Sequence, residues 1–240
     1  MSGRAILVIG LGLLAGSVVA AQEPIAAKKK PKPTECPGGV KYDDGSFENG
    51  YRPAGFSPGY LVQQFDAPAY PAKLDRVCIN LRGVERNAVP MRFYIVVWKA
   101  EPDRFWPGPG IRLEPTTLIA AMPATASVAK GSQWIAYDIS PANVIISAPV
   151  FIGLSWRGLD PYNNYADIFL SGDEGRRTPP RLGYYYIDYL DRDPPPLDLR
   201  SSEFDSWSNL YIALPKEKAL AVRVIFSRTA ALAQDLTTHN

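Results

Sequence analysis

The chain has 240 residues, of which 46% are hydrophobic, and its 13 Tyr, 9 Phe and 5 Trp are ample for one packed core. Its 23 Pro and 19 Gly interrupt the chain too often for long helices. The formal net charge is +2, but residues 1–34 carry Arg4 and four lysines against Glu23, so residues 35–240 carry a net charge of −2. A near-neutral domain with dispersed basic residues argues against nucleic-acid binding, which needs a concentrated positive surface.

The N-terminus has the pattern of a secretory signal peptide over residues 1–21. After Arg4, residues 5–19 carry no charge and are about as long as the apolar region of such peptides. The small residues that follow predict cleavage before Gln22, or within a residue or two of it. An uncleaved anchor is the alternative, although a membrane-spanning helix needs ~20 apolar residues. No other stretch is long and apolar enough to cross a bilayer, so the mature chain is expected in the periplasm or outside the cell.

Residues 22–35 are predicted to be a disordered linker, because this Lys- and Pro-rich stretch lacks the apolar side chains that offset the entropy cost of ordering. We favour a solvated tether for these lysines, with contact to anionic lipid or wall polymer as the alternative. Residues 36–228 are expected to form a single domain, since their length suits one large all-β unit. Residues 229–240 are expected to be a C-terminal tail.

Apolar and polar residues alternate in short segments that Gly, Pro, Asn and Asp separate, which is typical of β-strands. The clearest segments are Tyr60–Phe65, Lys73–Leu81, Met91–Lys99, Thr117–Met122, Trp134–Ile139, Val150–Trp156, Ile168–Ser171, Gly183–Tyr189 and Leu220–Ser227. Met91–Lys99 is apolar on both faces over its second half, which predicts a strand covered on each side.

Many short strands without intervening helices predict antiparallel pairing, and two stacked sheets bury the inner faces of such strands. The sequence therefore predicts an all-β fold, an antiparallel two-sheet β-sandwich of jelly-roll type, with a closed barrel as the alternative. Long loops are expected at residues 103–115, 159–166, 172–181 and 191–205, and loops of this length often carry function. The sequence carries no signal for an oligomeric state.

The mature chain has two cysteines, Cys36 and Cys78. Export and an even count favour a disulfide between them. Cys78 shares the polar face of its strand with Arg76 and Asn80, so this bond would attach the entering chain to the outer face of the sheet. Two free thiols are the alternative, and a metal site is disfavoured because no histidine or third cysteine accompanies them.

The segment YDDGSFENGY, residues 42–51, is the most distinctive in the chain. Its Asp-Gly and Asn-Gly pairs are turn signals. Its carboxylates, Asp43, Asp44 and Glu48, are hard oxygen ligands of the kind that Ca²⁺ prefers, although the spacing of an EF-hand is absent. We favour a structural turn over a structural calcium site, and we expect no organic cofactor.

The same segment and several later motifs carry a resemblance to known proteins. The later motifs are QQF at residues 63–65, PAKLDRV at 71–77, PGPG at 107–110, VFIGL at 150–154, SW at 206–207 and VRVIF at 222–226. With them, residues 42–228 resemble a family of β-sandwich accessory domains of exported bacterial proteins that begin with a YDDGxxEN-type element. The resemblance implies a jelly-roll-like fold and a role in binding or attachment.

No catalytic constellation rises above background. The only histidine, His239, lies beside the C-terminus, where an imidazole is hard to hold rigidly against a nucleophile. A hydrolase with two carboxylates needs no histidine, and acidic loop residues could supply the pair. These residues are Asp160, Asp167, Asp173, Glu174, Asp188 and Asp191. We expect no enzyme activity, with a secreted carbohydrate-active hydrolase as the alternative.

Two aromatic segments, residues 156–165 and 183–189, combine tyrosines with Asn, Asp or Arg. Sugar rings stack on aromatic side chains, while amides and carboxylates bond their hydroxyl groups. The sequence therefore predicts a binding site for a glycan or cell-surface polymer. Its residues are Tyr162, Asn163, Asn164, Tyr165 and Asp188. Packing of these aromatic residues in the core is the alternative.

Processing of the N-terminus is directly testable. Because an uncharged segment ends in small residues, we expect the mature chain to begin at Gln22 or within a residue or two of it. Intact-mass measurement of protein recovered from the periplasm or the medium checks this expectation. A full-length mass that retains Met1 would contradict the signal peptide.

Overall fold

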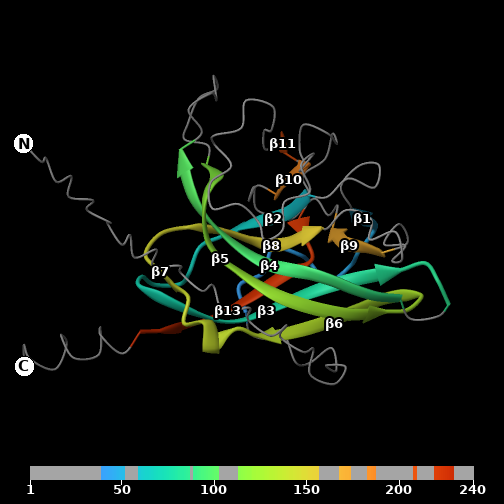
Figure 1. The fold of residues 1–240 in the computed structure, drawn as a ribbon. Coiled ribbons are helices and arrows are strands. Elements are labelled where there is room, and N and C mark those ends of the chain that lie inside the picture. The colour runs from blue at the N-terminus through green and yellow to red at the C-terminus, as the bar shows by residue number, and fades with distance from the viewer. Residues whose placement is uncertain are drawn as a thin grey trace, which may run out of the picture.

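The alternating apolar residues of the sequence form two antiparallel β-sheets that pack face to face (Figure 1). The computed structural model describes residues 39–51, 59–86, 89–102, 113–156, 168–173, 183–187, 208–209 and 219–229. These residues contain strands, one short 3-10 helix, η2 (Ser140–Ala142), and no α-helix. The predicted two-sheet β-sandwich is therefore confirmed.

One sheet has six strands among the described residues, in the order β11-β10-β2-β8-β4-β5. Its strands are β2 (Gly59–Phe65), β4 (Val89–Pro102), β5 (Leu113–Val128), β8 (Val150–Trp156), β10 (Gly183–Ile187) and β11 (Ser208–Asn209). The strands β4 and β5 form a long hairpin. Since β8 pairs with both β2 and β4, it has backbone partners along both edges.

The other sheet has seven strands among the described residues and is built around β3 (Ala72–Gly83). Its other strands are β1 (Asn49–Tyr51), β6 (Gly131–Asp138), β7 (Ile145–Ile146), β9 (Ile168–Asp173), β12 (Ala219–Leu220) and β13 (Val222–Arg228). Along one edge, β3 pairs with β13 and β9, and along the other it pairs with β6 and β7. Both β1 and β12 pair with β9.

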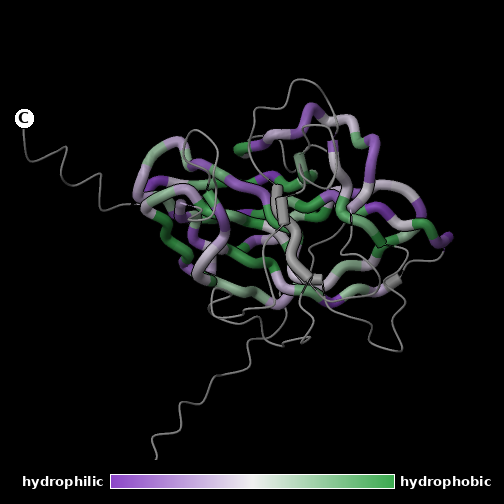
Figure 2. Tube along the Cα trace, turned by 90° about the horizontal axis from the view of Figure 1, so that it is seen from above, coloured by the Kyte–Doolittle hydropathy of each residue, from purple (hydrophilic) through white to green (hydrophobic). Residues whose placement is uncertain are grey.

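Side chains from one face of each sheet fill the space between the sheets. Hydrophobic and hydrophilic residues alternate along many of the strands (Figure 2). In β3, Val77, Ile79 and Leu81 are fully buried in this core, as the alternation predicts. Tyr137 of β6 packs edge-on against Phe93 of β4, with ring centroids 5.7 Å apart. Burial raises the pKa of Tyr137, which is therefore a core phenol.

A second apolar cluster lies on the outer face of the six-stranded sheet. Val96 and Trp98 of β4 are fully buried on this face, and Trp98 meets Tyr60 of β2 edge-on with ring centroids 5.6 Å apart. The alternate residues of β4, Ile95 and Val97, are buried in the core between the sheets. The prediction that this strand is covered on each side is confirmed.

Among the described residues, β5 is the last strand of the six-stranded sheet. The carbonyl groups of Thr125 and Ser127 point away from β4 and accept hydrogen bonds from side chains of β6. Tyr137 donates its hydroxyl to Thr125 at 3.0 Å, and Gln133 donates its side-chain amide to Ser127 at 2.7 Å. The backbone groups of Pro123 also face away from β4, because their direction alternates from one residue to the next along a strand. Proline has no N–H group to offer there.

All nine predicted strands are present, and the structure adds β1, β7, β11 and β12, which are too short to show an alternation. The strand β5 begins at Leu113, earlier than predicted, because it pairs with β4 as far as Pro102. The strand β9 extends to Asp173, because it pairs with β12. The expected loops at residues 103–115 and 172–181 were therefore predicted too long. Residues 113–115 belong to β5, and residues 172–173 belong to β9.

Gly153 in β8 lies where strands of the six-stranded sheet approach one another closely, and substituting it tests this contact. A Cβ atom at this position would lie 1.9 Å from the carbonyl oxygen of Leu61 in β2. Since β8 is paired along both edges, Gly153→Ala should displace backbone and lower the free energy of unfolding by ~1–3 kcal/mol. Thermal or urea denaturation measures the change, with Ser127→Ala at an exposed position of β5 as the control. Equal stabilities would show that the strand spacing adjusts without cost.

Candidate functional site

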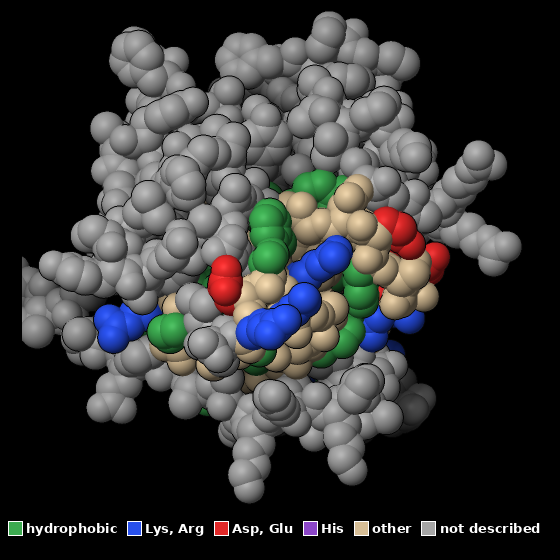
Figure 3. Space-filling model, turned by 90° about the vertical axis from the view of Figure 1, so that its right-hand side faces the viewer, with side chains coloured by type: hydrophobic (Ala, Val, Ile, Leu, Met, Phe, Trp, Pro, Cys, Tyr) green, Lys and Arg blue, Asp and Glu red, His purple; other side chains and the backbone are tan. Residues whose placement is uncertain are grey.

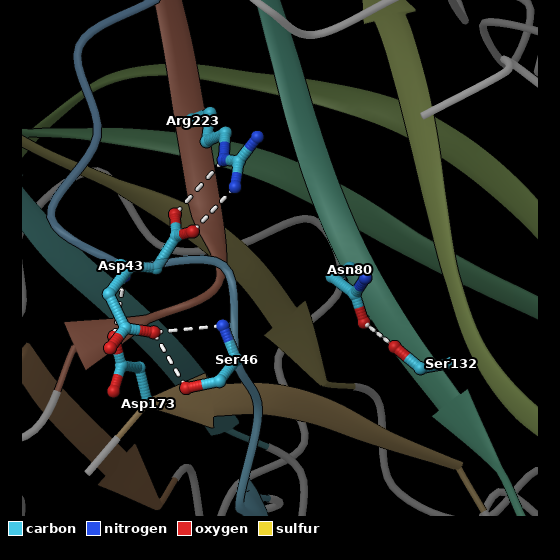
Figure 4. Close-up of polar contacts among 7 residues, drawn as sticks. Asp43, Ser46, Asn80, Ser132, Asp173 and Arg223 are labelled. Atoms are coloured by element: carbon cyan, nitrogen blue, oxygen red, sulfur yellow. Dashed lines mark hydrogen bonds and ion pairs between the residues drawn. The ribbon is translucent and has the colours of Figure 1, made fainter. Parts of the chain in front are cut away.

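Residues 39–48, called the strap below, cross the outer face of the seven-stranded sheet (Figure 4). The strap begins beside β13, where Val40 and Val224 exchange two backbone hydrogen bonds of 2.8 and 3.1 Å. A Cβ atom at Gly39 would lie 2.3 Å from the carbonyl oxygen of Val224. A glycine at this position therefore lets the strap lie directly against the strand.

A buried ion pair fixes the strap to β13. Arg223 donates through Nε to Oδ2 of Asp43 at 3.0 Å and through Nη2 to Oδ1 at 2.6 Å (Figure 4). The side chain of Asp43 is 0% exposed and that of Arg223 is 12% exposed, so solvent screens the pair little. The guanidinium carbon lies 4.3 Å from the ring centroid of Trp134, within the range of a cation–π contact. Phe47 of the strap meets the same ring edge-on, at 5.7 Å between centroids.

Carboxylates hold the second half of the strap in a turn. Oδ1 of Asp44 accepts hydrogen bonds from the backbone N–H of Ser46 at 2.8 Å and from its hydroxyl at 2.6 Å. The same hydroxyl lies 2.6 Å from Oε1 of Glu48. The backbone N–H of Asp44 donates to Oδ2 of Asp173 in β9 at 2.6 Å. The predicted turn residues therefore bond to one another and to the sheet.

The three predicted calcium ligands do not lie together in the structure. The carboxylate of Asp43 is buried against Arg223, whereas the carboxylates of Asp44 and Glu48 belong to exposed residues and contact Ser46. Among the described residues, no group of three or more His, Cys, Asp or Glu side chains is arranged to hold a metal ion. The calcium site stays a prediction.

Asn80 of β3 is 2% exposed and lies on the outer face of the seven-stranded sheet. Its Oδ1 accepts hydrogen bonds from the hydroxyls of Ser132 on β6 and Ser171 on β9. Its Nδ2 finds no acceptor in the part of the chain that the structure describes, and neither does Nη1 of Arg223. Asn80, Ser132, Trp134 and Arg223 are called the donor strip below; they lie on β3, β6 and β13.

The donor strip is not among the sites that the sequence predicts. The alternation within strands places Asn80 and Arg223 on outward faces, which is the signal the sequence contains. The sequence does not show which strands pair. In the structure, Asn80 lies opposite Trp134, and Arg223 lies opposite Cys78. These pairings join strands that are far apart in the chain, so local patterns cannot bring the four side chains together.

The predicted glycan-binding residues are outside the part of the chain that the structure describes. They are Tyr162, Asn163, Asn164, Tyr165 and Asp188. Of the acidic residues considered for a hydrolase, Asp173 is fully buried and bonds the strap. The others lie outside the described residues, and they are Asp160, Asp167, Glu174, Asp188 and Asp191.

Cys78 lies on the outer face of β3 and is 0% exposed, and its neighbour on that face, Asn80, is buried as well, whereas Arg76 is partly exposed. On this face the strap contacts Arg223 and Trp134, which lie opposite Cys78 and Asn80 in the neighbouring strands. The structure records Cys78 as disulfide-bonded and not as a free thiol. Cys36 lies outside the described residues, so its pairing with Cys78 stays a prediction.

Charged side chains of both signs occur on the described surface. Figure 3, which views the right-hand side of Figure 1, shows Lys and Arg side chains near the middle and at both sides of the described surface, and Asp and Glu side chains to either side of its middle. Within the described ranges, no helix is long and apolar enough to span a bilayer. In comparisons with known proteins, no family model, curated protein or solved structure matched the chain.

The predicted Cys36–Cys78 disulfide would close a loop of about forty residues, for which the chain-entropy model gives ~3–4 kcal/mol of stabilisation. We expect no alkylation of the folded, unreduced protein and two alkylated thiols after reduction in denaturant. Peptide mapping under non-reducing conditions should recover the two cysteines in one linked fragment. Alkylation of either thiol before reduction would contradict the pairing.

Proposed function

We propose that the mature chain is an exported, non-catalytic β-sandwich that binds a glycan or another oxygen-rich polymer of the cell surface through the donor strip. The observation that carries the proposal is Nδ2 of Asn80, a donor group on a buried residue without an acceptor among the described residues. This atom is not one of the fully buried, unpartnered side-chain atoms of the described residues, so it is accessible from outside the sheet. An oxygen atom from water or from a ligand is therefore expected beside it.

The neighbours of Asn80 suit a sugar-like ligand. Trp134 supplies an aromatic ring, and Nη1 of Arg223 supplies charged donors for hydroxyl or carboxylate oxygens. Ser132 adds a hydroxyl on the exposed side of β6. A few polar groups beside an aromatic ring are the usual means by which sites orient polar, ring-shaped ligands.

The predicted site around Tyr162 and Tyr165 remains part of the proposal as a second contact surface for the same polymer. The signal-peptide pattern of residues 1–21 supports a location in the periplasm or outside the cell. The resemblance of residues 42–228 to accessory domains of exported bacterial proteins supports a role in binding or attachment.

A carbohydrate-active hydrolase is the second candidate, and one observation favours it. Carboxylate oxygens of Asp44 and Glu48 both lie 2.6 Å from the hydroxyl oxygen of Ser46. The two carboxyl groups are therefore close, as in retaining glycosidases, where they are ~5–5.5 Å apart. Both residues are exposed, however, and a glycosidase acid usually needs a buried setting that raises its pKa. We therefore rank this function second.

The donor strip is tested by binding assays on the mature chain with purified cell-wall polymers and glycans. Asn80→Asp keeps the Oδ1 acceptor for both serine hydroxyls and removes the two N–H donors. We expect this variant and Trp134→Ala each to weaken binding of a polymer that the wild type retains by about tenfold, ~1.4 kcal/mol. Isothermal titration or affinity electrophoresis measures the change.

Two further variants separate the possible outcomes. Ile119→Ala changes an exposed residue of β5 on the other sheet and should leave binding unchanged. The double variant Tyr162→Ala/Tyr165→Ala tests the predicted aromatic site. Loss of binding in the double variant but not in Asn80→Asp would move the site away from the donor strip. Hydrolysis of a polymer by the wild type, lost in Glu48→Gln, would support the hydrolase.

A further inference from the structure

We infer that the donor strip binds an anionic group of its polymer, a carboxylate or a phosphodiester, and that Arg82 of β3 is a further residue of this site. The inference rests on the proposed function, because it names the chemical class of the ligand at the same surface. Two observations carry it. The unused hydrogen-bonding groups of the strip are mainly donors, and Arg82 lies beside them without a counter-ion among the described residues.

The hydrogen-bonding groups left over around Asn80 can donate but hardly accept. Its Oδ1 already accepts two serine hydroxyls, so Nδ2 is the group that remains. Arg223 uses Nε and Nη2 on Asp43 and keeps Nη1, which can only donate. A sugar hydroxyl both donates and accepts, whereas the oxygens of an ionised carboxylate or phosphodiester only accept. A surface of donors therefore favours an anionic group over a hydroxyl.

Arg82 extends this surface along β3. It lies two residues beyond Asn80, on the same face of the strand. In the neighbouring strands it is paired with Ser132 of β6 and with Phe169 of β9. Directly opposed side chains have Cβ atoms ~4.5–5.5 Å apart, so the side chain of Arg82 begins beside the hydroxyl that bonds Asn80. One ligand group can therefore reach both residues.

The charge of Arg82 is available to a ligand. The residue is exposed, and its guanidinium makes no ion pair or hydrogen bond with any part of the chain that the structure describes. Arg223, by contrast, is paired with the buried carboxylate of Asp43. A guanidinium carries five N–H donors in a planar fork that matches two oxygens of a carboxylate or a phosphate. A neutral sugar would leave this charge unused.

Acidic side chains of the same face are engaged elsewhere. Asp138 of β6 lies opposite Arg76, at the other end of the pairing between β3 and β6. The exposed carboxylates of the strap are bonded to Ser46, which Figure 4 shows apart from Asn80. Among the described residues, none of these carboxylates is bonded to Arg82, so the position beside it is open to an anionic ligand.

Binding of acidic polymers and of a neutral counterpart to the mature chain tests the inference. The probes are polygalacturonate, its carboxyl-reduced form and polyglycerol phosphate. We expect at least one acidic polymer to bind about tenfold more tightly than the carboxyl-reduced form. Raising the salt concentration should weaken this binding, because salt screens exposed charges. The acidic polymer that binds more tightly identifies the group as a carboxylate or a phosphodiester.

Three variants test the role of Arg82. Arg82→Gln should weaken binding of the acidic polymer about tenfold, reduce its salt dependence and leave the melting temperature unchanged. Arg82→Lys keeps the charge without the fork and should retain part of the binding. Arg228→Gln is the matched control, since Arg228 is also exposed and unbonded but lies at the other end of the same sheet, opposite Ala72. This control should change the affinity by less than about twofold.

The outcomes separate this inference from the proposed function. Equal binding of polygalacturonate and its carboxyl-reduced form, weakened for both by Asn80→Asp, would overturn the inference and leave the proposed function standing. Equal losses in Arg82→Gln and Arg228→Gln would show that binding follows overall charge, and this result would overturn the inference as well. Failure of both acidic polymers to bind would also overturn it, and the neutral glycans alone would then decide the proposed function.

Discussion

Over residues 77–82 of β3 and 222–225 of β13, side chains point alternately to the two faces of the sheet, and this constraint decides their surroundings. Val77 and Ile79 fill the space between the sheets, while Cys78 and Asn80 occupy the outer face. Both Cys78 and Asn80 are buried on that face, and polar groups in such a setting need partners. The strap supplies one of them, since Asp43 neutralises the guanidinium of Arg223.

The two sheets have outer faces of opposite character. The six-stranded sheet buries an apolar cluster around Trp98, whereas the seven-stranded sheet buries an ion pair and an amide. Apolar burial is not directional, so it fixes the position of a covering segment only loosely. The bidentate contact of Asp43 with Arg223 and the backbone exchange of Val40 have defined geometry. They fix the register in which the strap lies on the sheet.

Much of the fold follows from the sequence, because strand position and facing are local properties. The alternation of Val77, Ile79 and Leu81 is readable without any knowledge of neighbouring strands. Strand ends are less predictable, since β5 is as long as its partner β4 requires. The donor strip could not be derived in this way, because Asn80 and Trp134 are joined only by strand pairing.

The segment YDDGSFENGY shows a different limit of sequence reasoning. Its residue types indicate a turn and oxygen ligands, and both interpretations treat the carboxylates as equivalent. In the structure they are not, because Asp43 faces Arg223 across the sheet while Asp44 and Glu48 share a serine hydroxyl. The difference arises from a residue 180 positions away in the chain, which no local pattern reveals.

The arrangement of β5 bears on how these molecules behave at high concentration. Unpaired strand edges promote aggregation, because another chain can add to them through backbone hydrogen bonds. On the outer side of β5, Pro123 offers no N–H group, and the carbonyl groups of Thr125 and Ser127 are already bonded to side chains of β6. A second molecule adding a strand here would gain few hydrogen bonds and would displace two. Over residues 123–127, β5 therefore resists intermolecular growth through its composition.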